Sequence, residues 1–565
     1  MRHWNPYLVL LLALGACSPQ SDPEPADLIL RGGKIATVDE NFSFAEAVAI
    51  RGNEIVFVGS SAGTEDWIGE RTQLIDLDGE LVTPGLTDAH CHPFNLGKTE
   101  EEAFTVAGST SFAQVVERVS EKVSTMESGE WLIGGGWSEQ DWPGKELPVH
   151  DDLSAATPEN PVFLYRRGGN SSFVNQRALE IAGIDASTPD PYGGKIHRKE
   201  TGEPTGFLVN MGNNLVKDHF PEDTQPDSWY RGVYREAARK SHEVGLTGWH
   251  DAGAYPKDIA IYKQLVDRGE LEMRVNMMLQ NPRLDYDETV DYFNEHRVLN
   301  YGGEHLFQVR SVKVFFDGAL GSRGARFYEP YDDDPENTGV FEIRPEHLRD
   351  VVRAGLATGM QICPHNIGTR GNGEFLDAVE RALEDNPVDD HRFRSEHSQI
   401  VRASDVARFV ELGVIPSMQP IHATSDMPFV EERIGETRAR EGAYVWRSLL
   451  DAGAIIASGS DFTVESHRPL WGYYAAVTRQ DHDGQPEGGW FPEQRMTREE
   501  ALRSYTIWPA VAAFEEDVIG SIEVGKLADI IVLDTDILTA QAPDILEANV
   551  LYTIVNGKIV FEHER

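Results

Sequence analysis

Apolar runs rich in branched and aromatic residues alternate with amphipathic stretches through the middle of the chain. The apolar runs have the length and composition of buried strands, and they cover residues 85–92, 245–253, 274–280, 309–318, 360–368, 393–401, 414–420 and 455–462. Helical patterns follow several of them, at residues 350–359, 374–386, 403–413 and 444–453. Eight strands that alternate with helices predict a closed parallel (β/α)₈ barrel, a TIM barrel of the α/β class.

Both ends of the chain carry a different pattern. Short alternating strands, separated by glycine-containing turns such as "RGG" and "RGN", occupy residues 27–83, and similar strands return in residues 518–565. Neither end has enough strands for a stable sandwich by itself. We therefore predict one small β-sandwich domain built from both ends, with the barrel domain spanning residues 84–517 between them.

One connection in the predicted barrel is far too long. About 150 residues separate the first two strands, whereas a parallel crossover needs about a dozen. The gap contains further strand-like segments, including "WLIGGGW" and "PVFLYRRGGNSSFVN". This pattern predicts a large insertion after barrel strand 1, with a β-containing subdomain at about residues 130–215 above the barrel mouth.

The amino-acid composition and net charge indicate which classes of function are compatible with the chain. Hydrophobic residues form 40% of the chain and charged residues 25%, which is typical of a soluble globular protein. The 93 acidic and 51 basic residues give a formal net charge of −42. A field of this sign repels phosphate backbones, which argues against nucleic-acid binding. The sequence allows a homodimer and does not specify one.

The N-terminus predicts export. Residues 1–16 combine a short basic start with an apolar run too short to span a bilayer, which is typical of a signal peptide. The ending "LGAC" resembles the bacterial lipoprotein box, so we expect Cys17 to be lipidated and residues 17–26 to form a polar, proline-rich tether. The chain would then be anchored by lipid in the bacterial cell envelope, on the periplasmic side, and would touch the membrane through this anchor alone. Ser18 beside Cys17 resembles the sorting signal that favours the outer membrane.

Two further cysteines, Cys91 and Cys363, lie within predicted strands. An oxidising compartment would permit a disulfide between them. Alternation along the strands turns Cys91 away from the face of His90, whereas Cys363 shares the face of His365. The two cysteines would then face different spaces, so we predict two free thiols.

Polar residues gather at the predicted strand ends. The first strand ends in His90 and His92, an i, i+2 pair that can bind one metal ion from one side. The other members are Lys313 in the fourth strand, His365 and His397 at the ends of the fifth and sixth, and Asp461 after the eighth. Each has a structural alternative, such as a core histidine, an outward lysine or a helix N-cap. Catalytic side chains of such barrels lie at the C-terminal strand ends, so the conjunction predicts a functional site.

These segments resemble the amidohydrolase superfamily. "VTPGLTDAHCHP" matches its first-strand metal motif, and "GSIEVGKLADIIVLD" matches its returning β-domain segment. "VKVFFDGALGSRGA", "SMQPIHATSD" and "SGSDFTVESHRPLWGYYAAVTR" are similar to the YtcJ-like, or amidohydrolase 3, branch, which includes N-substituted formamide deformylases. The resemblance covers nearly everything after the tether.

The resemblance implies a metal centre. His90, His92 and Asp461 would bind one divalent metal, and His365 and His397 a second. Lys313 would bridge both as a carbamate, formed from its neutral amine and carbon dioxide, because burial lowers a lysine pKa; a plain lysine beside one metal is the alternative. Zinc suits these ligands, while manganese, iron and cobalt stay open.

The implied reaction is hydrolysis of a carbon–nitrogen bond in a small amide-like or formamide-like molecule. Metal-activated water would attack the carbonyl carbon, with Asp461 as general base and then general acid. Asp317, Arg323, His422 and Trp137 are candidate substrate contacts, with loop packing as the alternative.

Two positions depart from the branch pattern. Asn170 and Thr369 stand where relatives have a histidine and an aspartate. Neither departure removes a metal ligand, so both bear on the substrate.

Two rival interpretations stay open. The same metal site could act on an ester, a lactone or a cyclic amide, since a fold does not determine the bond cleaved. The chain could also be an envelope lipoprotein that binds a small ligand without turnover. The six polar rim residues argue against this second alternative, since a binder has no need for them.

Overall fold

The computed structural model describes residues 24–98 and 104–564. The predicted signal peptide, Cys17 and most of the tether lie outside these ranges. Among the helices within them, none combines the length and the apolar composition that crossing a bilayer requires.

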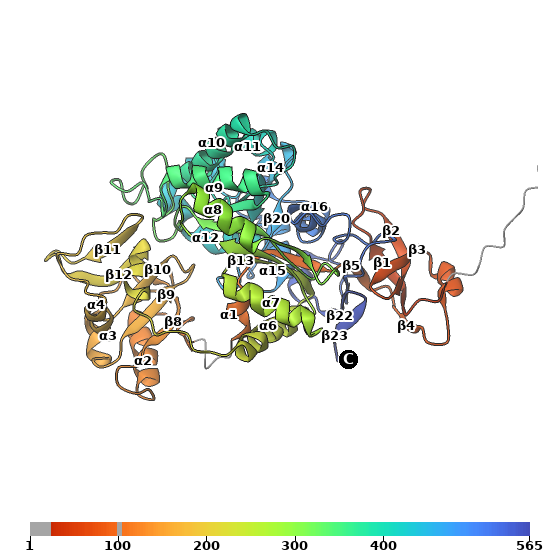
Figure 1. Cartoon of the computed structure of the whole chain (residues 1–565), viewed down its shortest axis with the longest axis horizontal. Coiled ribbons are helices and arrows are strands. Elements are labelled where there is room, and N and C mark those ends of the chain that lie inside the picture. The colour runs from red at the N-terminus through yellow and green to blue at the C-terminus, as the bar shows by residue number, and fades with distance from the viewer. Residues whose placement is uncertain (1–23, 99–103, 565) are drawn as a thin grey trace, which may run out of the picture.

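The central unit is a parallel barrel (Figure 1). Its eight strands follow one another in chain order, as successive βαβ units produce. They are β6 (Leu86–Cys91), β13 (Leu246–Ala254), β14 (Arg274–Gln280), β16 (Phe307–Phe315), β17 (Gln361–Asn366), β18 (Arg394–His397), β19 (Ile415–Met418) and β20 (Ala457–Ser458). Asp461 N donates to His90 O and His92 N donates to Phe462 O, both at 2.8 Å, which closes the ring. The predicted (β/α)₈ barrel is confirmed.

The barrel helices pack through one apolar face. In α9 (Pro345–Thr358), Leu348, Val351 and Val352 are buried at helical spacing, and the helix ends at Gly359 with a φ of +70°. Other helices of this domain are α6 (Asp227–His242), α7 (Pro256–Asp267), α8 (Tyr286–His296), α10 (Thr369–Asp385), α11 (Ala403–Glu411), α12 (Pro420–Ile434), α14 (Trp446–Asp451), α15 (Pro469–Thr478), α16 (Arg498–Ser504) and α17 (Ile507–Ala512).

Strands from both chain ends join at one end of the molecule (Figure 1). β5 (Leu81–Pro84) pairs on one side with β1 (Leu28–Ala36) and on the other with β21 (Ile530–Leu533), so neither chain end completes the sheet alone. The remaining strands are β2 (Phe44–Arg51), β3 (Glu54–Gly59), β4 (Gln73–Asp76), β22 (Val550–Val555) and β23 (Lys558–Glu562). Because β5 links the two halves by hydrogen bonds, strands from both chain ends form one continuous eight-stranded sheet.

The insertion after β6 contains its own six-stranded sheet, at the end of the molecule opposite the composite β domain (Figure 1). Its strands are β7 (Phe104–Thr105), β8 (Leu132–Trp137), β9 (Val162–Arg166), β10 (Ser171–Val174), β11 (Gly194–Arg198) and β12 (Pro204–Asn210). Its helices are α2 (Phe112–Val123), α3 (Asp151–Ala156), α4 (Gln176–Ile181) and α5 (Asn214–Lys217). The inserted sheet starts at β7, which is before residue 130.

The two cysteines of the barrel are separate, free and buried. Cys91 belongs to the main hydrophobic core, whereas Cys363 packs with Ala252 and Met278. The predicted pair of free thiols is confirmed.

Candidate metal centre

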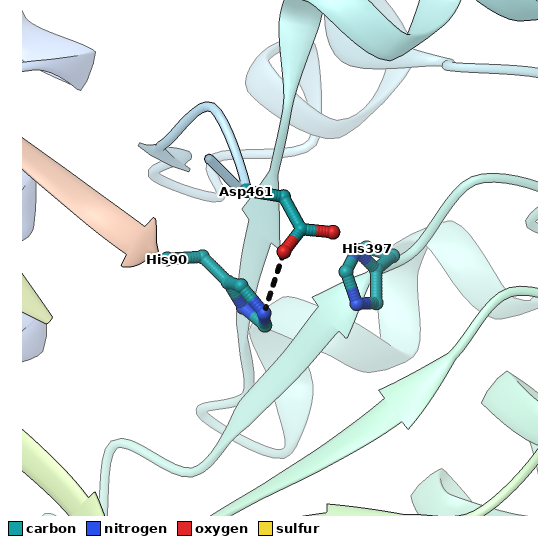
Figure 2. Close-up of side chains that lie close together, drawn as sticks. All are labelled: His90, His397 and Asp461. Carbon is teal, nitrogen blue, oxygen red and sulfur yellow. Dashed lines mark ion pairs between the residues drawn. The ribbon is translucent and has the colours of Figure 1, made fainter. Parts of the chain in front are cut away.

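Three predicted site residues converge at the C-terminal ends of barrel strands. His90 lies in β6, His397 ends β18, and Asp461 follows β20. One ligand atom from each lies within 4.8 Å of the other two (Figure 2). Their exposed fractions are 0%, 3% and 8%. The closed barrel thus brings together residues from its first, sixth and eighth strands.

Unusual backbone conformations accompany two of these side chains. The φ angle is +75° at His397 and +58° at Asp461, a region that residues other than glycine adopt rarely and at an energetic cost. A Cβ on Gly459 would lie 2.6 Å from both His90 N and Asp88 Oδ1, so only glycine allows this close approach to β6. The backbone is therefore constrained where the site is formed.

The Asp461 carboxylate lies between three histidines. Oδ1 is 3.0 Å from His92 Nε2 and 3.8 Å from His90 Nε2, while Oδ2 is 4.0 Å from His422 Nε2. Burial raises the pKa of Asp461, but the contact with His92 and the electrostatic effect of the surrounding histidines outweigh burial, so the pKa falls well below its usual range. Asp461 is therefore ionised at neutral pH and can accept a proton.

The His90 ring is held from both sides. Its Nδ1 is 2.5 Å from Glu396 Oε2, and its Nε2 is 2.9 Å from Lys313 Nζ. Because a carboxylate only accepts, Nδ1 carries the ring proton and Nε2 presents a lone pair. Burial, reinforced by Lys313, lowers the pKa of His90 to about 4, so the ring is neutral at pH 7. Burial also lowers the pKa of Lys313, which favours its neutral amine.

A buried ion pair lies behind His90. Glu396 pairs with Arg394 at 2.7 Å, and both side chains are fully buried. Arg394 Nη1 is 2.7 Å from His250 Nδ1, and Nη2 donates to Ser417 Oγ at 2.7 Å. Burial raises the pKa of Glu396, but the charge of Arg394 and the contact with His90 outweigh burial and lower the pKa to about 2. An ionised carboxylate thus orients His90.

His397 has a comparable partner. Its Nδ1 is 2.8 Å from Gln419 Oε1, and because an amide oxygen only accepts, Nδ1 carries the proton and Nε2 presents a lone pair. The His365 ring lies beside it, with ring centroids 4.4 Å apart. The side-chain amide of Asn170 reaches from the insertion to within 3.5 Å of His365 Nε2. Burial lowers the pKa of His365 to about 3, so this ring is also neutral.

The donor set of the cluster suits a divalent cation. His90 and His397 offer lone pairs on Nε2, and Asp461 Oδ1 is buried without a well-formed hydrogen bond in the described part of the chain. Bonds from zinc to imidazole nitrogen and carboxylate oxygen are about 2.0–2.2 Å, so one ion would hold its ligand atoms at most about 4.4 Å apart. The ligand atoms of the cluster lie within 4.8 Å of one another, so a small inward movement of the side chains would bring them to one ion. His397 groups here with His90 and Asp461, whereas the family resemblance assigns it to a second metal with His365.

Sequence reasoning missed the residues behind the two histidines. Glu396 and Arg394 occupy alternate positions of "FRSEHS", a strand with buried neighbours. Two charged residues at such positions are a signal for a buried pair, because a lone buried charge is very costly. Gln419 directly follows β19 at the same rim, as the predicted site residues follow theirs.

Two of the predicted substrate contacts lie away from the cluster. Trp137 is in the core of the insertion, where it stacks on Trp142 and its Nε1 donates to Leu164 O at 3.1 Å. Arg323 forms an ion pair with Asp333 at 2.7 Å. Packing and pairing occupy these side chains in the structure, and the interpretation of both as substrate contacts stays a prediction.

The Asp317 side chain forms its hydrogen bonds with backbone N–H groups. Its carboxylate accepts the N–H groups of Ile367, Gly368 and Arg326 at 2.8 to 2.9 Å. It therefore holds together the loops after β16 and β17, and its role as a substrate contact stays a prediction. His422 is the candidate contact that lies at the cluster, through its approach to Asp461.

Comparison with known sequences gives matches along almost the whole chain. A profile described as "Amidohydrolase family" matches residues 73–561. The chain is 34% identical to Protein LONG AFTER FAR-RED 3 of Arabidopsis thaliana, over 95% of this chain and 92% of that protein. It is 29% identical to Putative amidohydrolase YtcJ of Bacillus subtilis (94% and 99% covered). It is 27% identical to N-substituted formamide deformylase of Arthrobacter pascens (95% and 98% covered).

Solved structures give a consistent result. An uncharacterized metal-dependent hydrolase from Pyrococcus furiosus matches with a TM-score of 0.68 at 25% identity, covering 91% of this chain and 100% of that chain. The similarity therefore includes the additional sheets as well as the barrel.

Proposed function

Because the chain belongs to the amidohydrolase family, we propose that it is a metal-dependent hydrolase that cleaves a carbon–nitrogen bond in a small amide-like or formamide-like molecule. The observation that carries the proposal is the buried cluster of His90, His397 and Asp461 at the barrel rim. An ionised carboxylate beside neutral imidazoles is expensive to bury. A binding lipoprotein without turnover would have no use for it.

We propose that His90, His397 and Asp461, with His92 beside Asp461, hold one divalent ion. Zinc suits this combination of imidazole and carboxylate. Lys313 and His365 would complete a two-metal site when the Lys313 amine attacks carbon dioxide, forms an N–C bond and releases one proton to give an anionic carbamate. A plain lysine beside a single ion is the alternative, and the number of ions per chain separates the two.

In the reaction, a bound divalent metal would polarise the substrate carbonyl and acidify water. Asp461 supplies the proton acceptor: its carboxylate takes a proton from the attacking water as the water oxygen bonds to the carbonyl carbon. The protonated carboxyl then gives this proton to the nitrogen as the carbon–nitrogen bond breaks. One water is consumed, an acid and an amine are released, and Asp461 returns to its ionised state.

The substrate class is proposed from the relatives and from one departure. The Arthrobacter pascens relative is named an N-substituted formamide deformylase, so formamides are the first compounds to test. Asn170, which departs from the branch pattern, lies beside His365 at the proposed metal site. We therefore propose that longer acyl groups than formyl are tested as well, because this residue differs where the acyl group would bind. An ester, lactone or cyclic amide is the second candidate, because the same proton acceptor serves any polarised carbonyl.

The test compares the zinc-loaded chain with the same chain stripped of metal. Both are assayed on N-substituted formamides, longer N-acyl amines, esters and lactones, with acid release as the readout. We expect cleavage of an amide class only in the zinc-loaded preparation. Metal-independent cleavage, or no cleavage of any class by a chain with full metal content, would contradict the proposal.

We also propose that the chain is exported and lipidated on Cys17. Its support is the sequence pattern of residues 1–26. Expressed in bacteria, the native chain should fractionate with membranes, and a Cys17→Ser variant should be released as soluble protein. Equal fractionation of the two would contradict lipid anchoring.

A further inference from the structure

His422 faces the candidate metal centre with one ring nitrogen unpartnered. The residue lies in α12 and is 7% exposed. Within the described ranges, its Nε2 makes no hydrogen bond. Asp461 Oδ2 is 4.0 Å away, which is too long for one. A buried polar group without a hydrogen-bond partner lowers the free energy of unfolding by about 1–3 kcal/mol. We therefore infer that this nitrogen forms its hydrogen bond with a bound molecule.

The partner at the other ring nitrogen indicates where the proton lies. Gln399 Nε2 is 3.3 Å from His422 Nδ1. An amide NH₂ only donates, so Nδ1 accepts and the proton of the neutral ring is on Nε2. The Asp461 carboxylate opposite Nε2 favours the same tautomer. With the proton on Nε2, an N–H faces the carboxylate oxygen; with the proton on Nδ1, two lone pairs would face each other.

His397 has the opposite arrangement. Its Nδ1 faces the oxygen of Gln419, which leaves a lone pair on Nε2. The rings of His397 and His422 are stacked with centroids 6.1 Å apart and planes at 19°. Two glutamines, Gln399 and Gln419, thus present opposite ends of their amides to neighbouring histidines. One histidine is prepared to bind a cation and the other to donate a hydrogen bond.

We propose that His422 donates a hydrogen bond from Nε2 to the carbonyl oxygen of the substrate and is not a metal ligand. This inference rests on the proposed hydrolytic function. The carbonyl oxygen gains negative charge as water adds to the carbon, and a donor fixed beforehand strengthens its hydrogen bond as that charge develops. The proton stays on His422, while Asp461 carries the proton that moves.

A matched pair of variants tests this role. His422→Gln keeps an N–H donor close to the position of Nε2, whereas His422→Leu has none. Each zinc-loaded chain is measured for zinc content by mass spectrometry and for kcat in formate release from an N-substituted formamide. We expect wild-type zinc content in both variants, a fall in kcat of about 10²–10³-fold in His422→Leu, and recovery of about tenfold in His422→Gln.

Three outcomes would overturn the proposal. Loss of zinc from a folded His422→Leu would make His422 a ligand. Wild-type kcat in His422→Leu would remove it from the reaction, and equal losses in both variants would show that the N–H is not what the ring supplies. A wild-type chain that holds zinc but cleaves nothing would instead count against the proposed function.

A second measurement does not depend on activity or on the leucine variant folding. The zinc-loaded chain is labelled with ¹⁵N-histidine, and two-bond nitrogen–proton correlations identify which ring nitrogen carries the proton. His422→Gln provides the assignment. A proton on Nε2 supports the proposal, and a proton on Nδ1 overturns it.

Discussion

Replacing Glu396 by glutamine tests how the metal-facing ring of His90 is held. Oε2 of Glu396 is 2.5 Å from His90 Nδ1 and accepts from Arg394 Nη2 at 3.1 Å, and Oε1 is 2.7 Å from Arg394 Nε. Every contact is therefore made to a donor. Glutamine has the same shape as glutamate, but its side-chain NH₂ would face either the Arg394 guanidinium or the His90 N–H. In both orientations, two hydrogen-bond donors point at each other.

Two effects of Glu396→Gln follow, with different magnitudes. Arg394 becomes a fully buried cation without its counter-charge, and loss of one partner of a buried pair lowers the free energy of unfolding by about 3–5 kcal/mol. His90 can relieve the donor–donor contact by moving its proton to Nε2, which removes the lone pair offered to the metal. Changes behind a metal ligand reduce metal affinity about 10–100-fold.

The assay is competition for zinc with a chromophoric chelator, at a temperature where thermal unfolding shows the variant to be folded. Glu384→Gln, an exposed substitution on α10, is the matched control and should keep the wild-type zinc affinity. A Glu396→Gln chain with wild-type affinity would refute the reasoning that this carboxylate positions His90.

Three further predictions concern stability and reactivity. Burial lowers the pKa of His242 to about 4, so the unfolded chain takes up this proton below about pH 6.5, whereas the folded chain takes it up only near pH 4. Acidification from pH 6.5 to pH 4 should therefore lower the free energy of unfolding of the wild type relative to His242→Gln, by up to about 3 kcal/mol. Denaturant titration at several pH values measures this, and parallel curves would count against it. Trp137→Ala should lower the free energy of unfolding by about 3–5 kcal/mol by opening a cavity in the insertion, with zinc content unchanged; loss of zinc would return Trp137 to the site. In a Cys17→Ser chain, Cys91 and Cys363 should react with a thiol reagent only after denaturation, and rapid reaction of either in the native state would contradict their burial.

The barrel was predictable because each of its strands leaves a local signal. Each of the eight apolar runs, from residues 85–92 to 455–462, overlaps an observed strand. The continuity of the composite sheet was not predictable, because it depends on β5 pairing with strands from both chain ends. Pairing between segments so far apart is determined by tertiary contacts and not by local pattern.

The site was predictable where residue type and strand end coincide. His90, His397 and Asp461 are of that kind, and the structure brings them together. The loop residues Asp317 and Arg323 were not, because a polar side chain after a strand looks the same whether it binds a ligand, a backbone amide or another side chain. These partners are visible only in the folded structure.

The most direct test of the account is the zinc content of the purified chain compared with a variant that carries His90→Ala and His397→Ala together. His219→Ala, at an exposed histidine of the insertion, is the control. The account predicts one or two ions per wild-type and control chain, and loss of bound zinc in the double variant. The same content in all three folded proteins would mean that the cluster at the barrel rim is not the metal centre.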